Sequence, residues 1–402
     1  MTTSPSPSSP AAPVDIAPFG NHLPVRIRFG DGVADTLPAV LAEVGSSRPF
    51  VMLDEGIETF NAPVAVLLAL LDATAGITAT RFGKPAGEPT IDMVNDAVAA
   101  LMAADCDSVV AIGGGSVIDT AKAARLCGER GITFTEFLAS DRTYPTPSMP
   151  LVALPTSAGT GSEVSGGAVI SDPAAGRKAG IANANLRAQY ALVDPRLTYS
   201  MPPSMTANTG VDALAQAIAG MVAKCRTPIG DAIALEAIAM MGRSLVSAYR
   251  DGSNTAARSE MSCASMMAGL TMNISDCTAE HSLGQAIGGL KHVPHGLTIG
   301  LVLAETLDRE RFHVPAQLER VADALGEPDD GSGDGSRAVR AVTRILRELD
   351  FPVLSSLGVT DADLETLTDA ALDDFFITMA PAPWSRDEVL TAFGTALALT
   401  SR

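Results

Sequence analysis

The segment SVVAIGGGSVIDTAKAARL at residues 108–126 decides the fold. Its first five residues form an apolar run typical of a buried strand, and residues 117–126 have the spacing of a helix. The glycines and the serine between them, residues 113–116, let a phosphate approach the backbone at the positive end of the helix dipole. The segment lacks the G-x-G-x-x-G spacing of the dinucleotide fingerprint, so a phosphate site and a tight turn both remain open.

Strand and helix signals alternate on both sides of this segment. Short apolar runs at Pro49–Leu53 and Leu151–Leu154 predict two more buried strands, and the alternation predicts a mostly parallel sheet. After Asp194 the chain contains long Ala-, Leu- and Met-rich stretches with helical spacing, such as residues 229–249 and 258–274. We therefore expect a disordered tail at 1–21, an α/β domain at 22–194 and an all-α domain at 195–402.

Two further features favour a nucleotide in the α/β half. The loop LPTSAGTGSEV at 154–164 follows a strand, and its hydroxyls at Thr156, Ser157, Thr160 and Ser162 suit phosphates or ribose. Asp54 ends the first strand, where a carboxylate accepts hydrogen bonds from ribose hydroxyls and repels a 2′-phosphate, which favours NAD over NADP. A capped Gly/Ser turn and a simple turn residue are the alternatives. The loop is not a G-x-S-x-G nucleophile elbow, so a hydrolase triad is disfavoured.

Composition excludes several classes of protein. The 402 residues include 28 Lys and Arg against 46 Asp and Glu, a formal charge of −18, which argues against nucleic acid as the main partner. No apolar run is long enough for a transmembrane helix, so we expect no membrane partner. The five cysteines contain no C-x-x-C pair, which indicates reduced thiols in a cytoplasmic protein.

The helical half contains a sparse set of polar residues at helical spacing. Asp212 and Gln216 are separated by four positions in an apolar helix, as are His281 and Gln285. Imidazoles and a carboxylate from separate helices are suitable ligands for Zn²⁺ or Fe²⁺, although histidines in ordinary helix contacts fit the spacing too. His292 and His295 are a rival pair, but the proline between them disfavours a shared helical face.

Five segments together resemble the iron-containing alcohol dehydrogenase family, also called group III metal-dependent alcohol dehydrogenases. They are GGGSVIDTAK at 113–122, LPTSAGTGSEV at 154–164, VDPRL at 193–197, MPPSMTANTGVDAL at 201–214 and AEHSLGQAIGGLKHVPHG at 279–296. The order and spacing of the segments match the family across residues 22–400. The resemblance implies a Rossmann-like domain followed by a helical domain, as in the dehydroquinate synthase-like fold, with the active site between them.

The resemblance also implies which residues bind the nicotinamide cofactor. They are Asp54, Gly113, Gly114, Gly115, Ser116, Asp119, Thr156, Thr160 and Lys178. Ser157, in the same loop as Thr156, joins them as a candidate. Lys178 matches the family's lysine near the ribose and nicotinamide, with a surface lysine as the alternative.

The family's metal ligands are usually one Asp and three His, and this chain departs from that set. Asp212, His281 and His295 match three of the positions, whereas Gln216 occupies the fourth. Gln285 occupies a further position that is often histidine. A glutamine amide is a poorer ligand than imidazole, so we expect Asp212, His281 and His295 to hold Fe²⁺ or Zn²⁺, with Gln216 as a weak fourth ligand or an orienting group.

The resemblance implies reversible, NAD(H)-linked interconversion of an alcohol and an aldehyde or ketone, assisted by the metal as a Lewis acid. We expect His281, His292 and Gln285 in the catalytic region, with His292 one candidate for proton relay, and a homodimer or higher homo-oligomer. A metal-free reductase, similar to maleylacetate reductases, is one alternative. A non-catalytic cofactor-binding protein is another. A dehydroquinate synthase-like lyase is disfavoured because few basic residues accompany the motifs.

Overall fold

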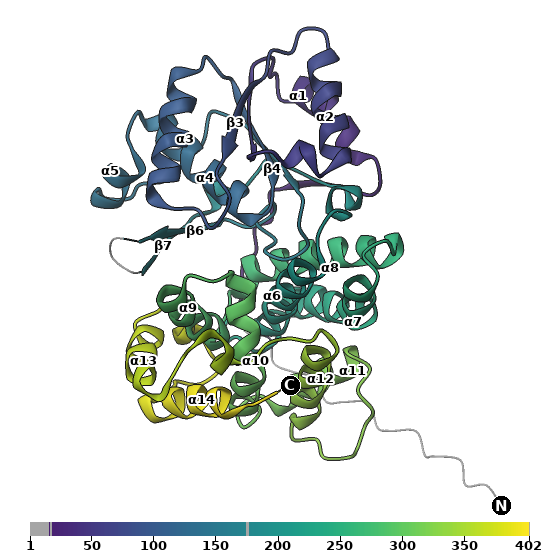
Figure 1. Ribbon diagram of the computed structural model, residues 1–402, viewed down its shortest axis with the longest axis vertical. Helices are drawn as coiled ribbons and strands as arrows, with labels where there is room; N and C mark the ends of the chain where they lie inside the picture. The colour runs from purple at the N-terminus through teal and green to yellow at the C-terminus, as the bar shows by residue number, and fades with distance from the viewer. Residues whose placement is uncertain (1–15, 17, 174–176, 402) are drawn as a thin grey trace, which may run out of the picture.

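The computed structural model describes residue 16, residues 18–173 and residues 177–401, and it forms two layers of different character (Figure 1). A parallel sheet covered by helices lies at one end, and a bundle of helices lies at the other. This arrangement confirms the predicted fold class. Most of the tail predicted at 1–21 lies outside the described residues. The division into two folding units at Asp194 stays a prediction.

The first layer is a six-stranded sheet in the order β1-β8-β5-β4-β2-β3, with every neighbouring pair parallel. The strands are β1 (Arg26–Phe29), β2 (Pro49–Asp54), β3 (Thr80–Lys84), β4 (Ser108–Gly113), β5 (Leu151–Pro155) and β8 (Tyr190–Val193). Their covering helices are α1 (Leu37–Glu43), α2 (Ala62–Ala73), α3 (Ile91–Ala103), α4 (Gly115–Arg130) and α5 (Phe134–Ala139). Strands β4 and β5 are buried throughout, because helices cover both faces of the sheet.

A small antiparallel hairpin leaves this sheet toward the helical layer. It consists of β6 (Gly167–Asp172) and β7 (Arg177–Ala182), and β7 lies above α9 (Ala279–Lys291) in Figure 1. The sequence analysis did not predict it, because both strands are rich in Gly and Ala and lack a clear alternation of apolar and polar residues. The hairpin therefore places residues of the first half beside a helix of the second.

The second layer is entirely helical. Its remaining helices are α6 (Pro203–Val222), α7 (Pro228–Arg250), α8 (Thr255–Ser275), α10 (His295–Glu310), α11 (Pro315–Ala324), α12 (Ser336–Glu348), α13 (Leu364–Leu372) and α14 (Arg386–Ala398). Helix α6 is buried from Gly210 to Val222 and packs against α7, α8 and α10. Added Cβ atoms at Gly210 and Gly220 would lie within 2.2 Å of Leu245 and 2.0 Å of Thr271, so both glycines permit this close packing.

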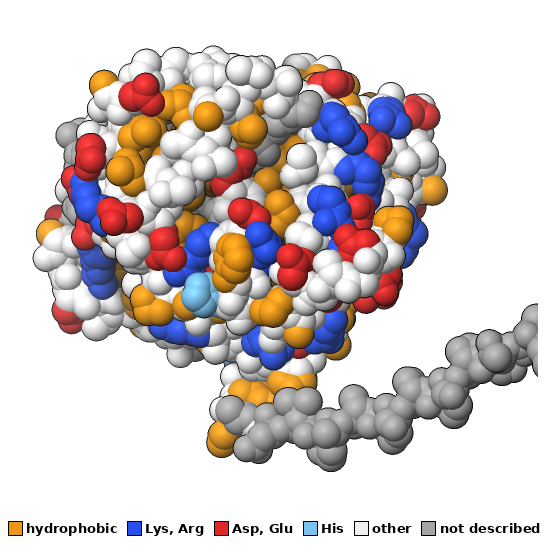
Figure 2. All heavy atoms as spheres, turned by 90° about the horizontal axis from the view of Figure 1, so that it is seen from below, with side chains coloured by type: hydrophobic (Ala, Val, Ile, Leu, Met, Phe, Trp, Pro, Cys, Tyr) orange, Lys and Arg blue, Asp and Glu red, His pale blue; other side chains and the backbone are white. Residues whose placement is uncertain are grey.

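Charged side chains of both signs cover the surface. The face of the helical layer in Figure 2 carries Lys and Arg side chains intermixed with Asp and Glu, and the described residues on it form no continuous basic stripe. Pairs such as Arg311 with Asp334, 3.1 Å apart, and Arg344 with Glu348, 3.4 Å apart, join such charges. Among the described residues, no helix is both long and apolar enough to cross a membrane.

Candidate metal and cofactor site

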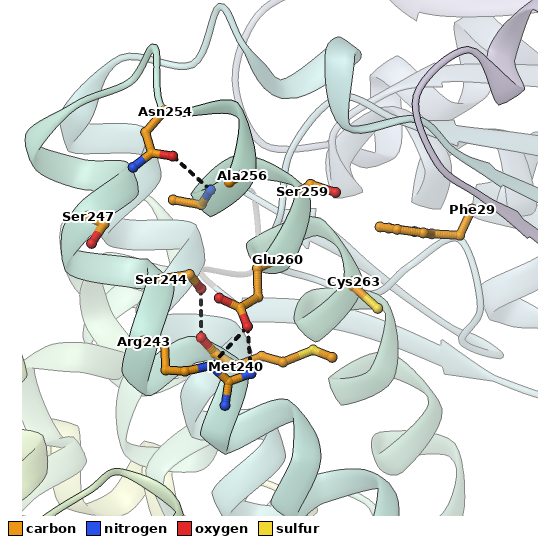
Figure 3. A pocket seen from close by; sticks show the side chains of 11 residues that line it. Phe29, Met240, Arg243, Ser244, Ser247, Asn254, Ala256, Ser259, Glu260 and Cys263 are labelled. Carbon is orange, nitrogen blue, oxygen red and sulfur yellow. Dashed lines mark hydrogen bonds and ion pairs between the residues drawn. The ribbon is translucent and has the colours of Figure 1, made fainter.

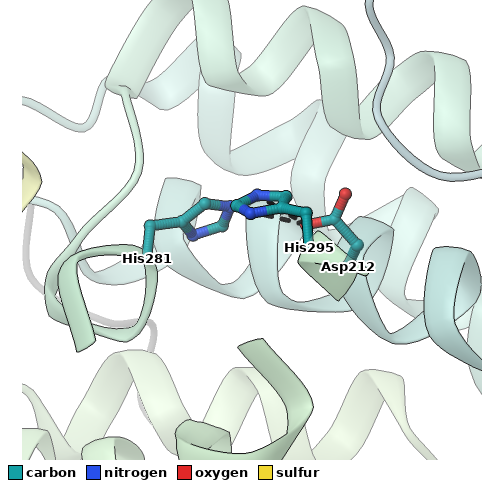
Figure 4. A group of neighbouring side chains, drawn as sticks. All are labelled: Asp212, His281 and His295. Atoms are coloured by element: carbon teal, nitrogen blue, oxygen red, sulfur yellow. Dashed lines mark ion pairs between the residues drawn. The ribbon is translucent and has the colours of Figure 1, made fainter. Parts of the chain in front are cut away.

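Three side chains from three different helices meet in the helical layer (Figure 4). Asp212 comes from α6, His281 from α9 and His295 from the first turn of α10. Oδ1 of Asp212 lies 3.5 Å from Nε2 of His281 and 3.7 Å from Nε2 of His295. These distances exceed those of good hydrogen bonds. Two ligands about 2.0–2.2 Å from a tetrahedral ion lie roughly 3.3–3.6 Å apart, so the spacing fits a shared metal ion.

Buried polar atoms without hydrogen-bond partners gather at the same place. They include Oδ1 of Asp212, Nε2 of His281 and Oε1 of Gln216, and all three side chains are almost fully buried. A buried polar atom without a partner costs roughly 1–3 kcal/mol, so three in one place need an explanation. A divalent cation satisfies a carboxylate oxygen, an imidazole nitrogen and an amide oxygen at once. The residues therefore fit a metal.

Gly296 brings the beginning of α10 against α6. An added Cβ at Gly296 would lie 2.1 Å from the carbonyl oxygen of Asn208 and 3.1 Å from Cβ of Asp212. Any other residue would force the two helices apart at this point. Because His295 directly precedes this glycine, the close approach holds its imidazole beside Asp212.

The pKa values of Asp212, His281 and His295 are shifted in different directions. Burial disfavours the carboxylate of Asp212, but His295 and His281 outweigh this effect and lower its pKa. Burial also opposes the charged form of His281, yet Cys277 and Asp212 hold its pKa well above the usual value. The pKa of His295 is lowered, mainly by burial. The site is therefore built around an ionised Asp212, which suits a cation.

The remaining polar residues predicted for this region lie around the three. Gln216 is one helical turn beyond Asp212, and its amide hydrogen bond lowers the Asp212 pKa further. Gln285 is half-buried, one turn beyond His281. His292 ends α9 in a left-handed conformation with an exposed side chain, so it shares no helix with His295. The roles predicted for Gln285 and His292 stay predictions.

The two Gly-rich loops lie side by side at the carboxyl edge of the sheet, where nucleotides bind in open α/β folds. Strands β4 and β5 are parallel neighbours, so the turn at Gly113–Ser116 meets the loop that follows Pro155. An added Cβ at Gly115 would lie 2.7 Å from Oγ1 of Thr160. Thr160 therefore packs against the glycine backbone of this turn, at the N-terminus of α4.

Asp54 stands next to the same turn. It ends β2, which pairs with β4, and it accepts a hydrogen bond from the backbone of Gly114. Burial raises the pKa of Asp54, while Lys84 and the Gly114 N–H oppose this shift. The structure thus brings the predicted ribose-binding carboxylate to the predicted phosphate turn.

Asp119 joins helix α4 to the second Gly-rich loop and to strand β6. Its Oδ1 accepts a hydrogen bond of 2.5 Å from Ser162, and its Oδ2 accepts one of 2.8 Å from the backbone of Val169. The buried ammonium of Lys122 lies 3.6 Å away and donates to Ser162 at 2.8 Å. Asp119 therefore holds the second Gly-rich loop to α4, and direct contact with a cofactor stays a prediction.

Lys178 lies on β7 and is paired with Glu88, a residue that the sequence analysis missed. Its ammonium also donates to Ser171 at 3.2 Å. Ser116 donates to the carbonyl of Gly87 at 2.8 Å, so the segment that follows β3 and carries Glu88 also contacts the phosphate turn. Burial is the main cause of the lowered His295 pKa, but Lys178 and Glu88 also act on it, which places them within electrostatic range of the metal ligands.

Glycine contacts hold the cofactor loops against the helical layer. An added Cβ at Gly159 would lie 2.5 Å from Cβ of Thr209, one turn before Asp212 on α6. Gly161 and Gly269 face each other, and an added Cβ at Gly269 would lie 2.6 Å from Cα of Gly161. The loop after β5 therefore rests on the helices beside the metal ligands, which brings the two candidate sites together.

A separate pocket lies on the outer side of α7 and α8 (Figure 3). It encloses about 590 Å³ and includes Phe29, Met240 and Cys263. Its charged residues are already paired, because Arg243 donates to Glu260 at 3.0 Å. None of the groups of described residues that could hold a metal belongs to it.

Comparison with known proteins matches the N-terminal and C-terminal halves of the chain to models of the same family. The family model described as "Iron-containing alcohol dehydrogenase" matches residues 24–195. The model described as "Fe-containing alcohol dehydrogenase family, C-terminal" matches residues 206–397. The chain belongs to the iron-containing alcohol dehydrogenase family. This confirms the resemblance inferred from the motifs, and membership makes the protein an oxidoreductase that acts on alcohols.

Individual relatives agree with this assignment. The chain is 34% identical over 354 residues to a probable alcohol dehydrogenase, EutG, of Escherichia coli (strain K12), covering 88% of each chain. A crystal structure of 1,3-propanediol oxidoreductase superposes with a TM-score of 0.89 at 27% identity, over 94% of this chain and 100% of that one. Sulfoacetaldehyde reductase from Bifidobacterium kashiwanohense, solved in complex with NAD⁺, superposes with a TM-score of 0.86 at 27% identity, over 95% and 99%.

Members of the iron-containing alcohol dehydrogenase family use NAD(H) and a divalent metal, usually iron. The described part of this member supplies a group of candidate ligands for the metal in Asp212, His281 and His295. The cofactor-binding residues predicted in the Gly-rich turn and in the loop beside it stay predictions.

Proposed function

We propose that the protein is an NAD(H)-dependent alcohol dehydrogenase that also reduces the corresponding aldehyde or ketone. The observation that carries this proposal is the convergence of Asp212, His281 and His295, where Oδ1 of Asp212 and Nε2 of His281 are buried without partners. Gln216 adjoins this group through its hydrogen bond to Asp212. A divalent cation bound there polarises the oxygen of an alcohol or carbonyl group. Asp212, His281 and His295 hold it, and the amide oxygen of Gln216 is its fourth, weaker ligand.

The residues of the first half hold the dinucleotide. The backbone at Gly113–Ser116 and the positive end of α4 take its pyrophosphate, and Thr156, Ser157 and Thr160 donate hydrogen bonds from the neighbouring loop. Asp54 accepts from the adenosine ribose, and its charge disfavours a 2′-phosphate, so NAD is preferred over NADP. Lys178 contacts the other ribose, on the side facing His295.

The packing of the two halves orients the reactants. The loop after β5 rests on α6 through Gly159, and the hairpin β6–β7 carries Lys178 over α9. These contacts would hold a bound nicotinamide beside Asp212, His281 and His295, where it would supply or accept the hydride.

Metal loading combined with a carbonyl screen tests the proposal. Chelator-treated protein is reloaded with Fe²⁺ under anaerobic conditions, or with Zn²⁺, and assayed against aldehydes and ketones with NADH and NADPH. We expect metal-dependent oxidation of NADH that His281→Ala abolishes. His313→Ala is the matched control, because His313 is exposed and outside the group of candidate ligands. Full activity of chelated protein would favour a metal-free reductase, and no turnover on any carbonyl would favour a non-catalytic cofactor-binding protein.

A further inference from the structure

Glu280 is a buried carboxylate directly beside a metal ligand. It is only 3% exposed and lies in the first turn of α9, immediately before His281. Its Oε1 lies 2.8 Å from Nδ1 of His281. Residues adjacent on a helix do not normally face each other, so helical geometry alone does not produce this contact.

Two further hydrogen bonds fix the carboxylate in place. The backbone N–H of Thr278 donates to Oε1 at 3.1 Å, and the hydroxyl of Thr278 donates to Oε2. The thiol of Cys277 belongs to the same buried group, with its sulfur within 4.8 Å of the ligand atoms of Glu280 and His281. Glu280 is therefore held rigidly on the side of the imidazole that faces away from Asp212.

This contact decides which nitrogen of His281 faces the metal. In the neutral ring that a metal binds, with Nδ1–H donating to Glu280, the lone pair is on Nε2. This atom lies 3.5 Å from Oδ1 of Asp212 and has no hydrogen-bond partner. Rotating the ring by half a turn would break the bond to Glu280 and present carbon to the metal. Metal-binding histidines commonly donate their other N–H to such a carboxylate, which fixes the ring and strengthens the ligand.

We propose that Glu280 is a positioning residue that fixes the tautomer and ring orientation of His281 and thereby raises the affinity of the site for its divalent metal. The inference rests on the proposed metal site. A simpler role for Glu280 is to cap the N-terminus of α9 through Thr278. A cap contributes to stability but not selectively to metal binding, so the two roles predict different measurements.

Two substitutions separate orientation from charge. Glu280→Gln keeps an acceptor for Nδ1–H and for the Thr278 N–H, and its amide donates to the Thr278 hydroxyl, so it preserves the orientation without the charge. Glu280→Ala removes both the charge and the hydrogen bonds that orient His281. Glu310→Gln is the matched control, because Glu310 is also a buried carboxylate of the helical layer but bonds Trp384 at 2.8 Å instead of a ligand.

The experiment measures the dissociation constant of the full-length protein for Co²⁺ by competition with a chromophoric chelator, and records the visible spectrum of the bound Co²⁺. We expect Glu280→Ala to bind about 10- to 100-fold more weakly than wild type with an altered spectrum, since loss of such a partner typically has this effect. The dissociation constant of Glu280→Gln is expected between those of wild type and Glu280→Ala, and that of Glu310→Gln at the wild-type value. Thermal melting shows whether each variant is folded.

Several results would overturn the inference. If Glu280→Ala binds Co²⁺ within twofold of wild type, or loses no more affinity than Glu310→Gln, Glu280 does not position the ligand. If Glu280→Ala does not fold, Glu280→Gln decides the test. A Glu280→Gln variant with wild-type Co²⁺ affinity and spectrum would then overturn the inference. Wild-type protein that binds no Co²⁺ would instead refute the proposed metal site itself, and the inference with it.

Discussion

A methyl group added at Gly269 is expected to weaken NADH binding, although this glycine belongs to α8 of the helical layer. Its added Cβ would lie 2.6 Å from Cα and 2.7 Å from the carbonyl oxygen of Gly161, in the loop that follows β5. Carbon atoms pack favourably at about 3.5–4.0 Å, so the loop must withdraw by roughly 1 Å. Gly161 has a φ of 59°, a left-handed conformation that leaves it little freedom to adjust.

The size of the effect follows from the cost of overpacking. Such insertions typically cost about 1–3 kcal/mol, whereas Ala in place of Gly inside a helix returns about 1 kcal/mol. Unfolding stability should therefore change by less than about 2 kcal/mol. If the loop must regain its place to bind the cofactor, the full cost falls on binding, which corresponds to roughly a 5- to 150-fold higher Kd for NADH.

Fluorescence titration with NADH measures this Kd directly. Gly394→Ala is the matched control, since Gly394 lies within α14 and an added Cβ there meets nothing within 4 Å. It should bind NADH like wild type. If Gly269→Ala binds NADH as tightly as Gly394→Ala does, the loop after β5 does not depend on its contact with α8, and the reasoning fails.

Three further predictions concern single side chains. Burial raises the pKa of Glu310 to about 7 from an unfolded value near 4.5, so its contribution to stability is present below pH 4.5 and lost as the pH rises to about 7. Urea unfolding at pH 5 and pH 8 gives the loss of unfolding free energy between these pH values. This loss should be smaller by about 1–3 kcal/mol in Glu310→Gln than in wild type. Asp54→Asn should lower the NADH/NADPH ratio of kcat/KM by about tenfold or more, because it removes the charge that repels a 2′-phosphate, and an unchanged ratio would contradict the role given to Asp54. Gln216→His should tighten Zn²⁺ binding measured by chelator competition, because imidazole is the better ligand, whereas weaker binding would mean that Gln216 does not face the ion.

Three of the six strands of the sheet layer, β2, β4 and β5, were predictable because they are continuous apolar runs, whereas β1, β3 and β8 were not predicted. The strands predicted at 49–53, 108–112 and 151–154 each extend one residue further in the structure, and the helix predicted at 117–126 lies within α4. These segments are buried on both faces, so their composition alone indicates their position. The hairpin β6–β7 carries no such signal.

The three candidate metal ligands could be named from the sequence because family motifs mark their positions, and the structure brings them together. Their common location depends on Gly296, whose missing side chain lets α10 approach α6, and no periodicity in the sequence reveals that contact. Glu280 was missed for a related reason: its contact with His281 depends on side-chain rotamers rather than on spacing. The pairing of Lys178 with Glu88, 90 residues apart, likewise requires the folded chain.

The contacts of Asp119 also require the folded chain. The sequence places Asp119 in the first turns of the helix after the glycine loop, and its contact with a cofactor stays a prediction. In the structure its oxygens are engaged by Ser162 and Val169, so it organises the second loop. A motif match identifies the residue but not the direction in which its carboxylate points.

The central claim is that Asp212, His281 and His295 form a metal site, and metal binding by the chelator-treated protein tests it most directly. Titration of this protein with Zn²⁺ should show one tightly bound ion per chain. The double variant Asp212→Ala, His281→Ala should bind none at that site while still binding NADH. Absence of a stoichiometric ion in wild type, or equal binding by the double variant, would contradict the account.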